Sequence, residues 1–213
     1  MVGRRCACPT LRKRWRFRGR LDIMGGMKLT SRFLEAVAYV LDAHADQRRK
    51  VSNTPYVAHL FKVAGIALEH GADEDEAIAA LLHDAIEDAG GPAARGEIRG
   101  RFGQRVVDIV DGCSDTDQMP KPPWQQRKEA FLARLASASP SVRLVEAADK
   151  LDNARSILCD YGRVGRPLWD LFRGGREGTQ WYYRSVVEVL KQSGTNPLLD
   201  ELDQAVRRIE QLA

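Results

Sequence analysis

The sequence lacks the features that would place it in a membrane or in an oxidising compartment. None of its segments reaches the run of about 18 apolar residues that a membrane-spanning helix needs. The first residues also contain no apolar stretch of signal-peptide length. The four cysteines are scattered, without the paired spacing of a zinc site or a disulfide framework: Cys6, Cys8, Cys113 and Cys159. We therefore expect a cytoplasmic protein with no membrane partner.

Strand-like alternation and internal repeats are also missing, whereas apolar residues recur three and four positions apart in most segments. Ser31 and Thr54 are candidate N-caps, and Asp73 with Glu76 forms a capping-box pattern. A chain of 213 residues can build one sizeable core. We therefore predict an all-α fold, a single helical bundle. The expected helices cover residues 31–41, 55–70, 73–89, 97–115 in two parts, 124–137, 141–158, 178–193 and 196–213.

Charge is unevenly distributed along the chain. Residues 1–26 contain seven arginines and one lysine against one aspartate, so the rest of a chain of net charge +4 is acidic. We predict a basic, disordered extension over residues 1–26 and one folded domain over residues 27–213. A nucleic-acid partner is not expected, because the folded part shows no basic face. An arm that binds nucleic acid or a membrane surface is the alternative interpretation of the extension.

The segment "AALLHDAIEDAG" (residues 79–90) combines the apolar pattern of a buried helix with four ionisable side chains. On one helix, His83 and Glu87 share a face, and Asp84 and Asp88 share the adjacent one. Burial of such groups without partners costs several kcal/mol each. A divalent metal ion is the first candidate to offset that cost.

Two more ionisable residues occur in apolar surroundings on separate predicted helices, His59 and Asp149. A buried histidine is often satisfied by one hydrogen bond, and Asp149 could instead pair with Lys150 or Lys62. Two imidazoles and two carboxylates, however, suit Mn²⁺, Fe²⁺ or Zn²⁺. The order His, His-Asp, Asp over three helices favours a metal site over these separate explanations.

Together with other motifs, this pattern resembles the HD-domain metal-dependent phosphohydrolases. The likeness is closer to the hydrolase domain of RelA/SpoT proteins and to the small alarmone hydrolases, a group that includes the metazoan SpoT homologues. It covers roughly residues 31–190. The segments that carry it are "RRKVSNTPYVAH", "AALLHDAIEDAG", "FGQRVVDIVDGCSD", "RKEAF" and "AADKLDNARSI".

The resemblance implies a Mn²⁺-dependent hydrolase that removes the 3′-diphosphate of ppGpp, with one Mn²⁺ per chain. Glu87 and Asp88 would activate the attacking water as catalytic residues. The resemblance implies four metal ligands: His59, His83, Asp84 and Asp149. It also implies contacts with the nucleotide substrate from Arg49, Lys50 and Asn153, and with its phosphates from Arg127 and Lys128. Nothing in the chain resembles a synthetase domain, so only degradation is expected.

Three departures from the family pattern leave the nucleotide open. Leu60 stands where relatives usually have Pro, Ala89 where they have Thr, and Asp152 where they often have His or Tyr. Asp152 would add negative charge near the nucleotide. The alternatives are an HD-domain phosphohydrolase acting on another nucleotide, or a non-catalytic module that binds metal or nucleotide. A non-catalytic module would have no need of Glu87 and Asp88.

Overall fold

A computed structural model describes residues 28–88, 91–116 and 120–213. Over these residues the chain is helical, and its only strand-like feature there is an isolated bridge between Arg48 and Pro55. The elements are α1 (Ser31–Ala43), α2 (Val57–Glu69), α3 (Glu74–Leu82), α4 (Ala85–Asp88), α5 (Pro92–Phe102), α6 (Gln104–Cys113), α7 (Trp124–Ala136), α8 (Pro140–Val164), the 3₁₀ helix η1 (Arg166–Leu171), α9 (Gly175–Lys191) and α10 (Pro197–Glu210). The all-α prediction is confirmed.

Two other predictions concern the basic N-terminal segment and the absence of a membrane-spanning helix. The basic segment 1–26 lies outside the described residues, so its separation from a domain over residues 27–213 stays a prediction. Within the described part, no helix combines the length and the apolar character needed to cross a membrane.

Helix starts follow local capping chemistry, in two cases at other residues than expected. Asp73 and Glu76 form the predicted capping box, with Asp73 Oδ1 accepting from the Glu76 amide at 3.0 Å and Glu76 Oε2 accepting from the Asp73 amide at 2.8 Å. Thr30, rather than Ser31, caps α1 through its hydroxyl oxygen. Thr54 does not cap α2, because the chain forms a tight loop before that helix begins at Val57.

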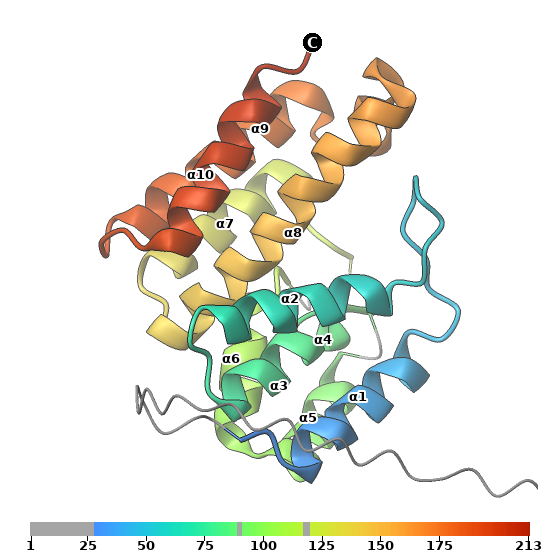
Figure 1. The fold of residues 1–213 in the computed structure, drawn as a ribbon, viewed down its shortest axis with the longest axis vertical. Coiled ribbons are helices and arrows are strands. Elements are labelled where there is room, and N and C mark those ends of the chain that lie inside the picture. The colour runs from blue at the N-terminus through green and yellow to red at the C-terminus, as the bar shows by residue number, and fades with distance from the viewer. Residues whose placement is uncertain (1–27, 89–90, 117–119) are drawn as a thin grey trace, which may run out of the picture.

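Helix α8 is the centre of the bundle. Figure 1 shows it between a group formed by α1 to α6 and the C-terminal pair α9 and α10. It packs against α2, α3 and α6 on one side and against α10 on the other. Ala148, Leu151 and Ala154 are almost completely buried along it. Burial of a Leu side chain of this kind contributes about 1.5–3 kcal/mol, so α8 offers a rigid support for polar groups on its inner face.

Candidate metal centre

Residues 79–88 do not form the continuous helix that their sequence predicts. Helix α3 ends at Leu82, a turn covers His83 and Asp84, and α4 begins at Ala85. On an uninterrupted helix, consecutive side chains do not face each other. At this turn, His83 Nε2 and Asp84 Oδ2 lie 3.0 Å apart. The side chains of these two adjacent residues therefore meet at the turn. The prediction that His83, Asp84, Glu87 and Asp88 lie in two rows along one helix is wrong, because the helix is interrupted at His83 and Asp84.

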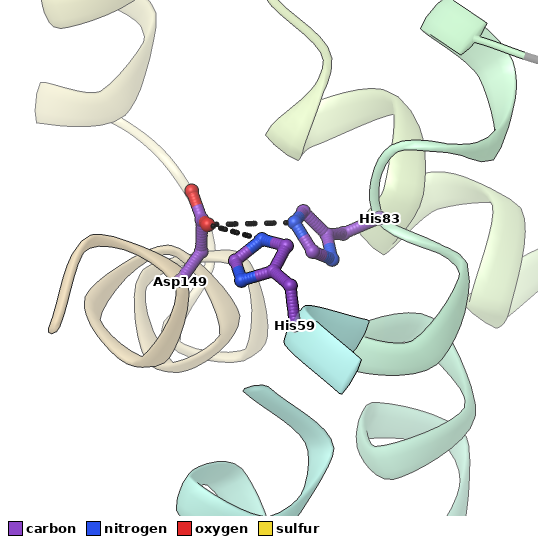
Figure 2. Close-up of side chains that lie close together, drawn as sticks. All are labelled: His59, His83 and Asp149. Atoms are coloured by element: carbon purple, nitrogen blue, oxygen red, sulfur yellow. Dashed lines mark ion pairs between the residues drawn. The ribbon is translucent and has the colours of Figure 1, made fainter. Parts of the chain in front are cut away.

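His59, His83 and Asp149 converge from three segments of the chain. His59 comes from α2, His83 from the turn after α3, and Asp149 from α8, as Figure 2 shows. Asp149 Oδ1 lies 3.1 Å from His59 Nε2 and 3.5 Å from His83 Nε2. One potential ligand atom from each residue lies within 4.8 Å of the other two, and all three side chains are buried. The structure thus brings together three of the four predicted ligands in one compact group.

Asp84, the fourth predicted ligand, lies at the edge of this group. Its Oδ2 is 3.8 Å from His59 Nε2 and also accepts a hydrogen bond of 2.6 Å from the Tyr56 hydroxyl. The phenol thereby fixes the carboxylate toward the two imidazoles. Sequence reasoning did not single out Tyr56, although it lies in the quoted segment that ends at His59.

Each imidazole is oriented through its Nδ1 atom. His83 Nδ1 donates to the Ala80 carbonyl at 2.9 Å, and His59 Nδ1 is 2.7 Å from Asp152 Oδ2. The Nε2 atoms of both histidines are buried and, among the described residues, make no hydrogen bond of good geometry, although each lies 3.0–3.1 Å from a carboxylate oxygen. A buried polar atom without a partner costs free energy. Two such nitrogens facing a carboxylate form a donor set that fits a divalent cation.

The electrostatics of the group favour a positive charge at its centre. Burial lowers the pKa of His83, but the facing carboxylates of Asp84 and Asp149 outweigh burial and raise that pKa well above its usual value. Burial raises the pKa of Asp149, but Lys150 and the two imidazoles outweigh it and leave the pKa well below its usual value. The carboxylates are thus charged ligands that a cation can bind.

Lys150 does pair with Asp149, as the alternative interpretation of the sequence proposed. Its Nζ lies 2.5 Å from Asp149 Oδ2 and 3.0 Å from Glu146 Oε2. Asp149 Oδ1 remains directed at the imidazoles and accepts from Asn153 Nδ2 at 2.5 Å. The two oxygens therefore have different partners, and the lysine pair does not replace the histidine contacts.

Glu87 and Asp88, the two predicted catalytic residues, lie on the short helix α4. Glu87 Oε1 accepts a hydrogen bond from the Asp115 amide, and its Oε2 lies 3.6 Å from Lys121 Nζ. Burial raises the pKa of Glu87, which suits a group that takes up a proton. The side chain of Asp88 lies outside the described part of the structure, so its role stays a prediction.

A polar cavity of about 180 Å³ adjoins the metal centre. Asp84, Glu87 and Asp149 line one part of it, and Lys128 and Lys150 bring positive charge to the rest. Of the two predicted phosphate-binding residues, Lys128 lines the cavity, with its Nζ 3.3 Å from Asp115 Oδ2. Arg127 does not line it.

The buried guanidinium of Arg127 contacts Asp115 and donates to the Pro122 carbonyl at 3.2 Å. It packs among protein groups beside the cavity. The geometry therefore favours Lys128 over Arg127 as a group that meets phosphate.

A second cavity, of about 340 Å³, begins on the other side of Tyr56 and Asn153, which line both. Its wall includes the predicted Arg49 and Lys50. Both come from a tight loop in which the Arg49 amide donates to the Thr54 carbonyl at 2.9 Å. The loop brings the Arg49 guanidinium to Asn153 Oδ1, 3.0 Å from each terminal nitrogen. The structure thus places all three predicted nucleotide contacts around one space.

With this geometry established, comparisons with known proteins identify the family. The family model described as HD domain matches residues 36–179. The chain belongs to the HD-domain family.

HD-domain relatives with assigned activities are similar over most of their length. The chain is 35% identical over 171 residues to the guanosine-3′,5′-bis(diphosphate) 3′-pyrophosphohydrolase MESH1 of Xenopus tropicalis, covering 78% of this chain and 88% of that protein. It is 33% identical over 175 residues to MESH1 of Homo sapiens, covering 80% and 90%. A solved structure titled "A metazoan ortholog of SpoT hydrolyzes ppGpp and plays a role in starvation responses" superposes with a TM-score of 0.69 at 28% identity, covering 86% and 98%.

An HD-domain site implies a divalent metal ion, and the unpartnered imidazole nitrogens agree with that. Sequence reasoning missed several polar residues of this HD-domain site because their roles depend on tertiary contacts. Asp115 ends a quoted segment, and Lys150 follows a predicted ligand directly, yet neither position alone indicates a cavity. The residues missed as parts of the site are Tyr56, Asp115, Glu146 and Lys150.

Proposed function

We propose that this protein is a metal-dependent 3′-pyrophosphohydrolase that converts the alarmone ppGpp to GDP and pyrophosphate, with Mn²⁺ as its metal. Its partner is then a small nucleotide. His59, His83, Asp84 and Asp149 would hold the ion. The bound ion supplies Lewis acidity at a phosphoryl oxygen and lowers the pKa of a water.

The observation that carries the proposal is that Tyr56 and Asn153, which donate hydrogen bonds to Asp84 and Asp149, line both cavities. The larger cavity, of about 340 Å³, is at the lower end of the size range of small-ligand sites and suits a nucleoside. The smaller cavity, of about 180 Å³, is lined by Lys128 and Lys150 and suits a diphosphate. Because Tyr56 and Asn153 line both, a nucleotide that reaches from one cavity to the other presents its phosphates beside Asp84 and Asp149.

Each part of the site then has a defined task. Arg49 offers a flat guanidinium that can stack on a purine, and Asn153 connects it to Asp149. Lys128 and Lys150 stabilise the charge of the leaving pyrophosphate. Glu87 takes the proton of the attacking water at its carboxylate, and Asp88 is proposed to assist it.

The substrate assignment is tested by a screen of the purified protein. Metal-free protein supplemented with Mn²⁺ is incubated with ppGpp and with a panel of other 3′- and 5′-phosphorylated nucleotides. We expect GDP and pyrophosphate from ppGpp, dependent on added metal. If ppGpp stays intact while another nucleotide is hydrolysed, the substrate is wrong and the hydrolase class remains.

A Glu87→Gln variant separates an enzyme from a module that only binds. The amide keeps the shape of the side chain but cannot accept the proton. Loss of a general base lowers kcat by about 10²–10⁴-fold, and Mn²⁺ affinity should change little. If neither wild type nor variant turns over any nucleotide, while both bind metal and nucleotide, the protein is a binding module.

A further inference from the structure

Asp152 lies on α8 in the "ADKLDN" segment, between the predicted ligand Asp149 and the predicted nucleotide contact Asn153. Its side chain is buried, at 3% exposure, on the inner face of α8. Oδ2 lies 2.7 Å from His59 Nδ1, and Oδ1 lies 3.4 Å from Lys62 Nζ. Both oxygens therefore face protein groups.

The expectation that Asp152 adds charge near the nucleotide stays a prediction, because Asp152 shares a groove with Arg49. Asp152 lines neither the 340 Å³ cavity nor the 180 Å³ cavity. It borders a groove between α2 and α8 together with Lys62, and this groove shares Arg49 and Asp160 with the 340 Å³ cavity. Its direct contact with the site runs through the ring of His59.

The two metal-facing histidines are held differently. His83 Nδ1 donates to a neutral acceptor, the backbone carbonyl of Ala80. A side-chain substitution does not remove this carbonyl. His59 Nδ1 instead faces a side-chain carboxylate, that of Asp152 on α8, which a substitution of Asp152 would remove. A histidine that binds metal through Nε2 must carry its hydrogen on Nδ1.

We propose that Asp152 is a positioning residue for the metal: it keeps the hydrogen of His59 on Nδ1 and fixes the ring so that Nε2 faces Asp149 and Asp84. The inference rests on the metal site of the proposed function. An acceptor of this kind also makes the coordinating nitrogen a stronger donor. Asp152 thus assists metal binding through the ring of His59.

The test is the metal affinity of the protein, measured without any substrate. Metal-free wild type, Asp152→Ala and Asp152→Asn are titrated with Mn²⁺ by calorimetry. Loss of a partner behind a metal-binding histidine weakens affinity by about 10–100-fold, which we expect for Asp152→Ala. Asp152→Asn should fall between that variant and wild type, because its Oδ1 can still accept from Nδ1 but carries no charge.

Asp160→Asn is the matched control. Asp160 lies on α8, borders the same groove and pairs with Arg163, so its change removes an equal charge without touching His59. Its Mn²⁺ affinity should stay within about twofold of wild type, because solvent and salt screen that charge. Long-range ¹H–¹⁵N spectra of the metal-free protein, recorded at a pH where the His59 ring is neutral, give a second readout. The Nδ1–H tautomer of His59 should dominate in wild type and lose that dominance in Asp152→Ala.

Equal Mn²⁺ affinity in Asp160→Asn and both Asp152 variants overturns the inference. If circular dichroism shows that Asp152→Ala does not fold, the isosteric Asp152→Asn decides by the same comparison. A wild type that binds Mn²⁺ but spares ppGpp removes the substrate assignment and leaves this inference intact. A wild type that binds no divalent ion removes both.

Discussion

Two buried acidic centres of the protein differ in where their positive charge comes from. Near the C-terminus, Asp203 on α10 accepts from three cationic side chains. These are Arg184 at 2.7 Å, Lys191 at 2.7 Å and Arg207 at 3.0 Å. At the centre of the bundle, Asp149 and Asp84 face imidazoles whose Nε2 atoms make no hydrogen bond of good geometry within the part of the chain that the structure describes.

The difference separates a structural centre from a functional one. The chain itself satisfies Asp203, so nothing more has to bind there. The central group holds its carboxylates in a fixed arrangement, and its two buried Nε2 atoms, which make no hydrogen bond of good geometry to the described residues, are available to a cation. Incomplete satisfaction of a rigid polar cluster, rather than the number of its charges, is what indicates a site.

The largest effect is expected from Asp149→Asn, which breaks the central group. The amide cannot replace a charged ligand between His59 and His83, so hydrolysis should fall by about 10³-fold, corresponding to several kcal/mol of transition-state stabilisation. Activity assays at saturating Mn²⁺ and metal analysis of the purified variant measure the loss. The variant should still fold, since Lys150 keeps Glu146 as a partner.

Chelation of the wild type provides the matching control. A chelator should abolish activity in the wild type, and added Mn²⁺ should restore it there but not in Asp149→Asn. Normal activity in the variant would show that the centre built around Asp149 is not the catalytic one.

The features of the two regions that depend on local chemistry could be predicted from the sequence. The capping box of Asp73 and Glu76 was predictable because both contacts lie within one helical turn. His59, His83 and Asp149 were predictable as a group because ionisable residues in apolar helices need a shared partner. Those predictions required only spacing and burial.

Other parts depend on tertiary contacts that no local pattern encodes. The residues before His83 are the good helix formers Ala and Leu, and no glycine or proline follows before Gly90, so the interruption after Leu82 was not predictable. Arg127 and Lys128 are neighbours of the same charge, yet Arg127 packs against Asp115 and Pro122 while Lys128 lines the cavity. Asp152 was interpreted from family likeness, and only its contact with His59 gives it a role.

A smaller effect, on stability rather than activity, is expected from Asp203→Asn. The burial of Asp203 raises its pKa, but the hydrogen bonds from Lys191, Arg184 and Arg207 outweigh burial and lower it. Removal of these charged hydrogen bonds should cost about 2 kcal/mol of unfolding free energy and lower Tm by about 4–8 °C. Activity should be unchanged. Thermal unfolding of the variant against Asp108→Asn, an exposed acid on α6, measures the effect.

The same variant gives a pH dependence with a defined sign. A carboxyl whose pKa is lower in the folded state stabilises the fold above its unfolded pKa, about 3.9 for Asp. The stability gap between wild type and Asp203→Asn should therefore be full near neutral pH and shrink as the pH falls below about 4. A gap that stays constant down to acid pH would show that Asp203 contributes through packing alone.

The smallest effect is expected at a third acidic cluster, on the surface, where Arg105 contacts Asp73 at 2.7 Å and Asp75 at 3.2 Å. The guanidinium is half exposed, so solvent weakens both ion pairs. Arg105→Gln should cost about 0.2–1 kcal/mol, since the capping box of Asp73 does not need Arg105. Urea unfolding at low salt and at about 0.5 M salt should show this loss shrinking as the charges are screened. The opposite result would be a loss of unfolding free energy that is independent of salt and as large as that of Asp203→Asn. Burial would then not determine how much an ion pair contributes to stability in this fold. The contrast between the acidic centres would rest on geometry alone.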